Sequence, residues 1–215
     1  PYTVGDETLR HIAVLAEELD LPIHTHMHET NDEIASSVAK HGVRPLERLK
    51  ALGIVGPRLI AVHSVHVNEA EMDLMAREGV SVAHCPSSNM KLASGMAPVA
   101  AMRSRGVRVG VGTDGAASNN RLDMMSEMRT GALLAKAASG DASAMGGYDA
   151  LEMATLEGAR ALGLPRGWAG QRGGCQAALR AVGGGARRAR PIRRRAPARV
   201  ARARPPRSGA GASGP

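Results

Sequence analysis

The chain has 215 residues, of which 43% are hydrophobic and 22% charged, a composition typical of a globular protein in water. No apolar run approaches the ~20 residues that a membrane-spanning helix needs, and the first residues carry no signal-peptide pattern. Two cysteines exclude a fold built on disulfides and favour a reducing, cytoplasmic compartment.

The net charge of +8 is unevenly distributed along the sequence. Residues 1–164 contain 15 of the 28 Lys and Arg residues and all 20 acidic residues, which gives a balance of −5. Residues 165–215 contain 13 arginines and no acidic residue. We therefore expect two parts, a folded domain at 1–164 and a basic tail at 165–215, and the net charge is no argument for nucleic-acid binding by the folded part.

Apolar periodicity predicts alternating helices and strands through residues 1–164. The helices are expected at 6–20, 31–42, 44–53, 69–79, 98–106, 121–138 and 148–163. The strands are expected at 21–29, 58–66, 80–86 and 107–115. Asp6 is the expected N-cap of the first helix, and Gly42 is the expected end of the second. Asn68 and Glu71 predict a capping box at the start of 69–79.

Four apolar strands separated by helices predict an α/β fold with a parallel sheet and helical crossovers. Four such units make half of an eight-stranded barrel. We expect the C-terminal half, about strands 5 to 8, of a (β/α)8 TIM-type barrel. A half-barrel has two open strand edges, and the sequence lacks an initiator methionine. Both features predict that this sequence is part of a longer protein.

Polar side chains collect at the carboxyl ends of these strands, where parallel-barrel enzymes carry out their chemistry. They are His24, His26 and Glu29, then His63 and His66, then His84, and finally Asp114. Strand alternation predicts that His24, His26 and His28 share one face, and three imidazoles in five residues favour a metal site. One extended strand cannot direct all three at one ion. One or two of them should therefore be structural or face a substrate.

Two carboxylates are candidates for proton transfer and metal binding. Glu29 follows the first strand, where it could carry protons beside a metal-bound water. Asp114 lies in the sequence VGVGTDG, and its flanking glycines should leave it accessible at a strand end. There it could complete a metal site of histidine and carboxylate ligands. Either His63 or His66 could reach the same pocket as a base or a ligand.

The glycines of the VGVGTDG segment also match the spacing of a dinucleotide-binding loop. They are Gly110, Gly112 and Gly115. That motif needs a helix directly after the glycines and an acidic residue about 20 positions further on. Residues 118–120 precede the next predicted helix, and the stretch about 20 residues past the turn is apolar. The sequence therefore argues against a dinucleotide site.

The composition of residues 165–215 differs from that of a folded domain. Of its 51 residues, 41 are Arg, Gly, Ala or Pro, and no helical or strand period is present. Such a segment cannot bury enough apolar surface to offset its ordering entropy, so we expect a disordered tail. The mixture is typical of out-of-frame translation of a GC-rich coding sequence. The alternative is an arm that attracts RNA, with nonspecific nucleic-acid binding.

Five segments, in this order, resemble the amidohydrolase superfamily. They are PYTV at 1–4, HTHMHET at 24–30, AVHSVH at 61–66, AHCPSSNMKLASGMAPV at 83–99 and GTDGAASNN at 112–120. Within the superfamily the sequence is most similar to the 5-methylthioadenosine/S-adenosylhomocysteine deaminase group of the chlorohydrolase/deaminase branch. The resemblance covers about residues 1–164 and stops there.

The resemblance implies roles for four side chains. His26 matches a metal-ligand histidine of the fifth barrel strand, and Asp114 matches a metal-ligand aspartate of the eighth strand that also serves as a base and contacts substrate. Glu29 matches the glutamate that moves a proton onto the substrate ring nitrogen. His63 matches the histidine that orients or deprotonates the attacking water. The implied cofactor is one divalent ion, zinc or alternatively iron.

The implied reaction is hydrolytic deamination of a purine nucleoside such as 5-methylthioadenosine or S-adenosylhomocysteine, in a protein that forms homo-oligomers. The family's first-strand H-x-H pair, which supplies two more metal ligands, has no counterpart here. We therefore expect the isolated chain to bind zinc weakly and to be nearly inactive. Guanine or 8-oxoguanine deamination and triazine-type dechlorination are alternatives on the same fold. A third hypothesis is a non-enzymatic, basic-tailed nucleic-acid-binding protein, whose salt-sensitive binding would require residues 165–215.

Overall fold

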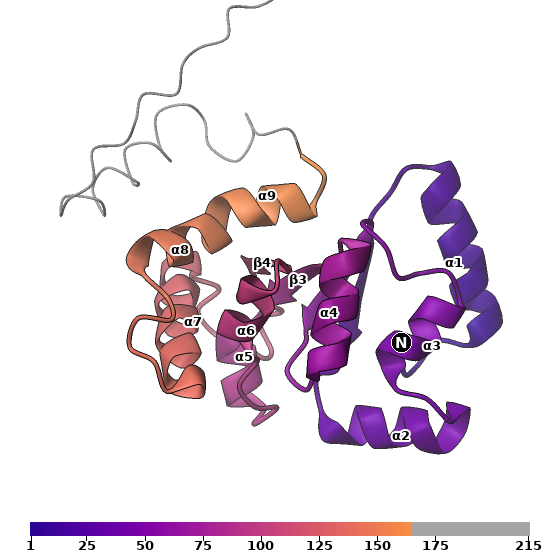
Figure 1. Ribbon diagram of the computed structural model, residues 1–215, viewed down its shortest axis with the longest axis horizontal. Helices are drawn as coiled ribbons and strands as arrows, with labels where there is room; N and C mark the ends of the chain where they lie inside the picture. Colours follow the sequence, from indigo (N-terminus) through magenta and orange to yellow (C-terminus); the bar gives the residue numbers. More distant parts are fainter. Residues whose placement is uncertain (165–215) are drawn as a thin grey trace, which may run out of the picture. The chain divides into compact units, whose positions relative to one another are not determined.

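The computed structural model describes residues 1–164, and the expectations for 165–215 lie outside the described residues. Residues 1–164 form a four-stranded sheet with the strand order β1-β2-β3-β4 (Figure 1). The strands are β1 (Ile23–Met27), β2 (Leu59–His63), β3 (Ser81–His84) and β4 (Arg108–Val111). Every neighbouring pair is parallel, which confirms the predicted parallel α/β sheet. None of the helices in this part of the chain has the length and apolar character to cross a membrane.

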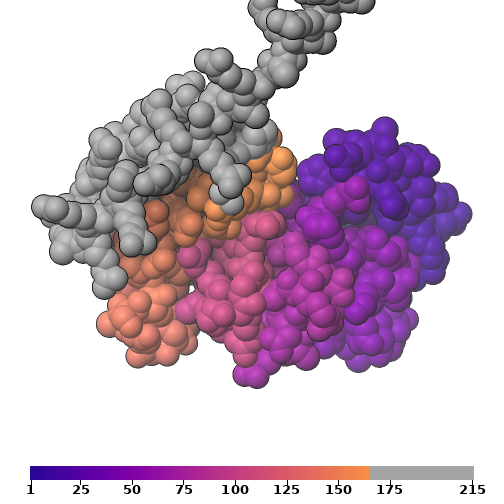
Figure 2. All heavy atoms as spheres, turned by 45° about the horizontal axis from the view of Figure 1, so that its top comes forward, coloured from indigo at the N-terminus to yellow at the C-terminus, as the bar shows by residue number. Residues whose placement is uncertain are grey.

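Helices precede, connect and follow the strands. They are α1 (Asp6–Glu18), α2 (Asn31–His41), α3 (Pro45–Ala51), α4 (Glu69–Glu78), α5 (Pro86–Lys91), α6 (Val99–Ser104), α7 (Met124–Ser139), α8 (Gly147–Glu152) and α9 (Gly158–Ala161). Successive segments lie next to one another, from the indigo residues of α1 to the orange residues of α8 and α9 (Figure 2). This order is expected when each strand–helix unit packs against the preceding unit.

Local signals in the sequence set several helix ends. Asn68 accepts a hydrogen bond from the backbone N–H of Glu71, and the Glu71 carboxylate accepts one from the backbone N–H of Asn68. The predicted capping box is therefore confirmed. Gly42 ends α2 in the left-handed conformation, as expected. The prediction for Asp6 is wrong, because Asp6 lies in the first turn of α1 and its carboxylate accepts hydrogen bonds from Arg48 instead.

Two segments differ from the periodicity-based prediction. Pro86 is the last residue of the strand predicted at 80–86, but β3 ends at His84 and Pro86 begins the short helix α5, because its fixed φ and missing N–H are tolerated in a first turn. The helix predicted at 148–163 contains a π-helical segment, Met153–Glu157. This helical region approaches β4 so closely that a Cβ on Gly110 would lie 3.1 Å from the Cα of Gly158. A side chain at position 110 would require the backbone at Gly158 to move by a few tenths of an ångström.

The core lies around the middle of the sheet. Strand β2 is buried along its whole length, whereas β1 alternates between partly buried and exposed residues. Fully buried side chains from α3, α4, α6 and the strands fill the space beside it. Among them are Leu46, Leu49, Leu59, Met75, Val82, Met102 and Val109. Burial of each such side chain stabilises the folded state by about 1.5–3 kcal/mol. The core therefore keeps the strands, and the residues at their ends, in a fixed register.

Candidate metal centre

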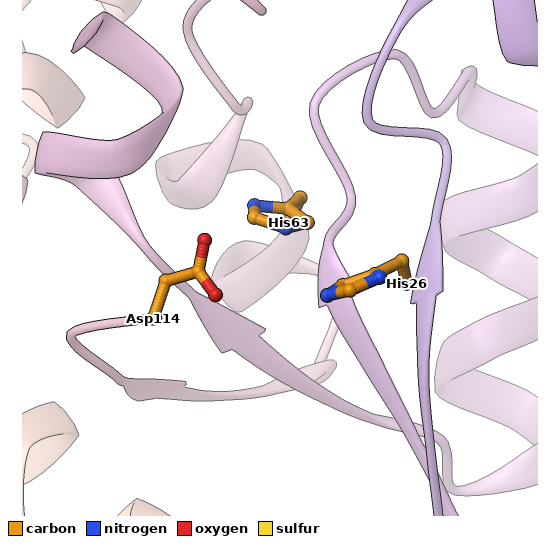
Figure 3. A group of neighbouring side chains, drawn as sticks. All are labelled: His26, His63 and Asp114. Atoms are coloured by element: carbon orange, nitrogen blue, oxygen red, sulfur yellow. The ribbon is translucent and has the colours of Figure 1, made fainter. Parts of the chain in front are cut away.

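Three side chains from different parts of the chain meet at the carboxyl edge of the sheet. They are His26 of β1, His63 at the end of β2, and Asp114 in the segment after β4 (Figure 3). One ligand atom of each lies within 4.8 Å of the ligand atoms of the other two. Within the described part of the chain, this is the one group of three or more potential ligands with such geometry.

Left-handed backbone conformations collect at this edge. His28, His63, Ser64 and Asp114 have φ values of +54°, +69°, +48° and +58°. Such conformations cost on the order of 1–3 kcal/mol for a residue with a Cβ, and they persist only where the surrounding structure holds them. The strained residues directly follow or end strands β1 and β2 or follow β4. The backbone therefore bends sharply at the points where it presents the candidate ligands.

The three side chains fit a divalent metal ion. Two imidazoles and one carboxylate, with further coordination positions left open, are a donor set typical of catalytic zinc sites. His63 is buried and Asp114 is partly buried, so water competes weakly for these two ligands. His26 is exposed on the open side of the group.

Two serines hold Asp114 in its ionised form. Its Oδ2 atom accepts hydrogen bonds from the hydroxyl groups of Ser88 at 2.7 Å and Ser118 at 2.8 Å. Burial alone would raise the pKa of Asp114, but these hydrogen bonds outweigh burial and hold the pKa below its usual range. Asp114 is therefore a carboxylate at neutral pH, ready to bind a cation or accept a proton.

Glu29 lies beside the three-ligand group but outside it. Its Oε2 atom is 3.7 Å from Nε2 of His63, a distance too long for a hydrogen bond. The hydroxyl group of Ser94 lies 3.5 Å from Oε1 of Glu29. The backbone N–H groups of Glu29 and His28 donate to the carboxylate of Glu33 at 2.8 and 3.1 Å. Glu33 therefore holds the turn that carries Glu29 next to His63.

The expectation that His28 shares a face with His24 and His26 is wrong. Strand β1 ends at Met27, and the left-handed conformation of His28 directs its side chain into the interior, where it is fully buried. Burial lowers the pKa of His28 to about 4. His28 is therefore neutral at pH 7 and lies outside the group of candidate ligands.

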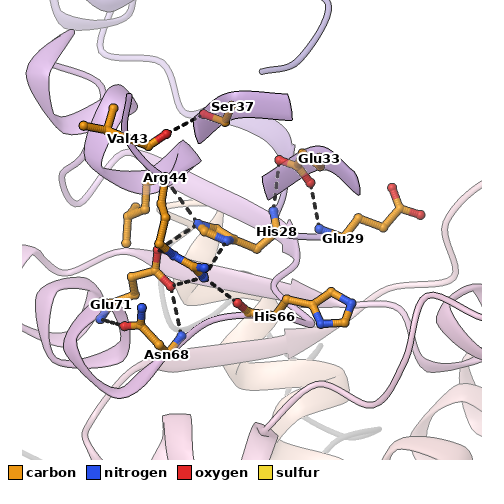
Figure 4. A network of polar contacts seen from close by, with 10 residues as sticks. His28, Glu29, Glu33, Ser37, Val43, Arg44, His66, Asn68 and Glu71 are labelled. Atoms are coloured by element: carbon orange, nitrogen blue, oxygen red, sulfur yellow. Dashed lines mark hydrogen bonds and ion pairs between the residues drawn. The ribbon is translucent and has the colours of Figure 1, made fainter. Parts of the chain in front are cut away.

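A network of polar side chains surrounds His28, the residue after β1 (Figure 4). The Arg44 guanidinium donates to both carboxylate oxygens of Glu71, each at 2.8 Å, and to the backbone carbonyl of His66 at 2.7 Å. Burial alone would raise the pKa of Glu71, but the hydrogen bonds from Arg44 outweigh burial and hold the pKa below its usual range. The network therefore ties the end of β1 to the loop after β2 and to the start of α4.

The remaining histidines predicted at this edge do not join the ligand group. His24 is exposed on β1. Nε2 of His66 lies 2.8 Å from the backbone carbonyl oxygen of Ser94, so this nitrogen has a partner outside the ligand group. His84 is buried, and neither of its ring nitrogens has a hydrogen-bond partner among the described residues. Burial, and then the charge of His63, lowers the pKa of His84 to about 4.

We expect the free energy of unfolding to fall as the pH decreases from about 6.5 to about 4. In the unfolded chain His84 binds a proton near pH 6.5, whereas in the folded chain it does so near pH 4. Between these two pH values the unfolded state therefore binds more protons than the folded state. Protonation of His84 lowers the free energy of unfolding by on the order of 3 kcal/mol over this window. Urea unfolding followed by circular dichroism across this window measures the loss.

The matched variant for this prediction is His84→Leu, which has a similar volume and no titratable group. His28 contributes to the acid sensitivity in the same direction, so the variant should lose about half of the pH dependence. Equal pH dependence in the variant and the parent chain would show that His84 does not cause the effect.

Three contacts at the site come from residues that sequence reasoning missed. Each joins one side chain of segment 86–94 to a different candidate residue. The pairs are Ser88 with Asp114 at 2.7 Å, Asn89 with His63 at 2.8 Å, and Ser94 with Glu29 at 3.5 Å. A short helix after a strand has no periodic signal of its own. Only the resemblance of residues 83–99 to a known family pointed to this segment.

Comparison with known proteins places the chain in a family. The model of the "Amidohydrolase family" matches residues 1–167. A 5-methylthioadenosine/S-adenosylhomocysteine deaminase of Teredinibacter turnerae is 49% identical over 164 residues, which cover 76% of this chain and 37% of that protein. A 5'-deoxyadenosine deaminase of Methanothermobacter thermautotrophicus is 50% identical over 167 residues, covering 78% of this chain and 39% of that protein.

Solved structures agree with the sequence relatives. An adenosine deaminase from Xanthomonas campestris with bound zinc superimposes with a TM-score of 0.75 at 55% identity, covering 76% of this chain and 37% of that chain. The E. coli guanine deaminase superimposes with a TM-score of 0.69 at 30% identity, covering 75% of this chain and 38% of that chain. The chain thus spans well under half the length of these relatives. The extent of the family match and the identity to deaminases show that the chain belongs to the amidohydrolase family.

Proposed function

We propose that residues 1–164 belong to a metal-dependent hydrolytic deaminase of purine nucleosides such as 5-methylthioadenosine or S-adenosylhomocysteine. The observation that carries the proposal is the meeting of His26, His63 and Asp114 within 4.8 Å. Relatives named as deaminases of such nucleosides, at about 50% identity, support this substrate class. Zinc is the proposed ion, with iron as the alternative, and the zinc in the Xanthomonas campestris structure supports that choice.

The side chains have distinct roles in this proposal. His26 and Asp114 would hold the ion, which when bound supplies Lewis-acid chemistry that makes water a better nucleophile. His63 orients the attacking water from its position between Asp114 and Glu29. Asp114 is ionised, accepts the first proton that the water loses and passes it to the amino group, which leaves as ammonia. Glu29 donates a proton to the purine ring nitrogen and recovers one from the oxygen that has added to the ring.

We propose further that residues 1–164 form one domain, the C-terminal half of a (β/α)8 barrel. The end of the family match at residue 167 supports this boundary. An apolar groove of about 500 Å³ lies between α1 and β1 and is lined by residues such as Leu15, Leu19 and Ile23. A neighbouring strand and its helix would cover that groove in a complete barrel. Homo-oligomer formation and a cytoplasmic location stay predictions.

Two other reactions are second candidates because of specific structural neighbours. The atrazine chlorohydrolase of Arthrobacter aurescens superimposes with a TM-score of 0.72 at 28% identity, covering 75% of this chain and 36% of that chain. The guanine deaminase of E. coli has a similar identity. The higher identity of about 50% to deaminases of adenine nucleosides favours the first proposal. The candidate ligand group disfavours a non-enzymatic nucleic-acid-binding protein.

A chimera tests the proposed function. Residues 1–164 replace the matching segment of the Xanthomonas campestris adenosine deaminase, to which they are 55% identical. We expect zinc-dependent release of ammonia from 5-methylthioadenosine. Asp114→Asn and Glu29→Gln should each lower kcat by about 10²–10⁴-fold, because each removes a proton-transfer group.

The matched control in the chimera is Asp141→Asn, because Asp141 is exposed and its carboxylate accepts hydrogen bonds only from Ser143 among the described residues. Its kcat should equal that of the unmodified chimera. A chimera that binds zinc but releases ammonia only from guanine, or chloride only from a triazine, would replace the proposed substrate class. Full activity in Asp114→Asn would contradict the proposed mechanism.

A further inference from the structure

His63 and Asn89 form a buried contact that the proposed roles leave unexplained. The Nδ1 atom of His63 lies 2.8 Å from the Oδ1 atom of Asn89, and the exposed fractions of the two residues are 1% and 0%. An amide oxygen only accepts hydrogen bonds, so a bond at this distance requires a proton on Nδ1. A neutral imidazole carries one proton. Its Nε2 atom then keeps a free lone pair.

We infer that Asn89 is a positioning residue, which fixes the ring of His63 in the tautomer with its proton on Nδ1. The Nε2 atom, which one ring carbon separates from Nδ1, has no part in the contact with Asn89 and lies 3.7 Å from Oε2 of Glu29. A lone pair at that atom is needed for His63 to bind a cation or to accept a hydrogen bond from the attacking water that it is proposed to orient. The role given to this tautomer, a free lone pair on Nε2, rests on the proposed function. The contact between His63 and Asn89 does not depend on the proposed function.

The backbone of α5 holds Asn89 in place. The Asn89 N–H donates to the carbonyl of Cys85 at 3.0 Å, and its carbonyl accepts from the N–H of Ser94 at 2.8 Å. Because both side chains are buried, water does not compete for Nδ1 of His63. The ring therefore depends on Asn89 for its hydrogen bond, and the helix gives the amide a fixed position.

The second polar atom of the Asn89 side chain supports a functional reason for this residue. Its Nδ2 atom is buried and has no hydrogen-bond partner among the described residues. A buried donor without a partner is destabilising, so an apolar residue would suit a purely structural position better. If the amide group were rotated so that Oδ1 and Nδ2 exchanged places, Nδ2 would donate to Nδ1 of His63. The ring would then carry its proton on Nε2, and that atom would have no free lone pair. The two arrangements predict opposite tautomers.

Nitrogen-15 NMR of the histidine side chains in the full chain, at alkaline pH where imidazole is neutral, distinguishes them. The signal of His63 is assigned by its loss in His63→Gln. We expect the proton on Nδ1 in the parent chain. Asn89→Leu removes the acceptor and should shift the tautomer ratio about tenfold toward the Nε2 form. Asn89→Asp retains an acceptor oxygen and should restore the Nδ1 form.

The control is Ser64→Ala, which alters a buried hydroxyl group next to His63 that has no hydrogen-bond partner among the described residues. It should leave the tautomer unchanged. Backbone amide spectra show whether each variant folds, and Asn89→Asp gives a second comparison if Asn89→Leu does not. A proton on Nε2 in the parent chain, or on Nδ1 in folded Asn89→Leu, would overturn the inference.

Kinetics of the chimera separate this inference from the proposed function. Asn89→Leu should lower kcat about 10–100-fold with little change in KM, as is typical when a supporting partner of a site histidine is lost. An inactive chimera whose His63 carries its proton on Nδ1 would contradict the deaminase proposal alone. An active chimera in which Asn89→Leu retains full kcat would contradict the role of Asn89 alone.

Discussion

Replacing His26 by alanine or Asp114 by asparagine is expected to abolish detectable zinc binding by this chain. The described part of the chain offers one group that could hold a metal ion, and removal of His26 or Asp114 leaves one of the two proposed ligands. Loss of a supporting residue already weakens metal binding by about 10–100-fold, and loss of a ligand should have a larger effect. Metal content after dialysis, measured by atomic emission, and titration with zinc check this prediction.

Several controls make the zinc experiment decisive. His11 is exposed on α1, away from the ligand group, so His11→Ala should bind as much zinc as the parent chain. We expect about one zinc per parent chain at saturation, with weak affinity, because the two proposed ligands hold the ion less tightly than the closed four-ligand sets of structural zinc sites. Undiminished zinc uptake by both His26→Ala and Asp114→Asn would place the ion elsewhere.

Glu71→Ala should lower the free energy of unfolding by about 2 kcal/mol. The substitution leaves the partly buried Arg44 guanidinium, whose side chain is 31% exposed, without its carboxylate partner, and the loss of charged hydrogen bonds at such a position is destabilising. It also removes the acceptor for the backbone N–H of Asn68, which weakens the start of α4. Urea unfolding at neutral pH, followed by circular dichroism, measures the change.

Glu69 provides the matched control for Glu71, because both lie in the first turn of α4. The side chain of Glu69 is 84% exposed and lies 3.5 Å from Arg105 in an ion pair. Exposed pairs contribute about 0–1 kcal/mol, so Glu69→Ala should change stability far less than Glu71→Ala. Equal effects of the two substitutions would show that the network around Arg44 does not stabilise the fold.

Local chemistry explains which elements could be predicted. Apolar periodicity correctly indicated the four strands and most helices, because burial acts on each element through the spacing of its own residues. The capping box of Asn68 and Glu71 was also predictable, since both partners lie within one helical turn. Asp6 was not, because its carboxylate binds Arg48, a residue 42 positions away.

Strand alternation predicts the wrong direction for the side chain of His28. Alternation holds only while the backbone stays extended, and β1 ends one residue before His28. The left-handed conformation at that point is supported by Glu33, which accepts hydrogen bonds from the N–H groups of His28 and Glu29. The residue types alone do not show that this carboxylate bends the chain there.

The sequence by itself determined the parallel α/β architecture and placed His26, His63 and Asp114 near strand ends, because periodicity and chain order are local properties. Their roles as ligands or proton carriers stay predictions. Only the tertiary structure decided that their ligand atoms lie within 4.8 Å and that Asn89 contacts His63. Those distances depend on the register between parallel strands and on left-handed turns. Packing and hydrogen bonds between residues far apart in the chain set both features.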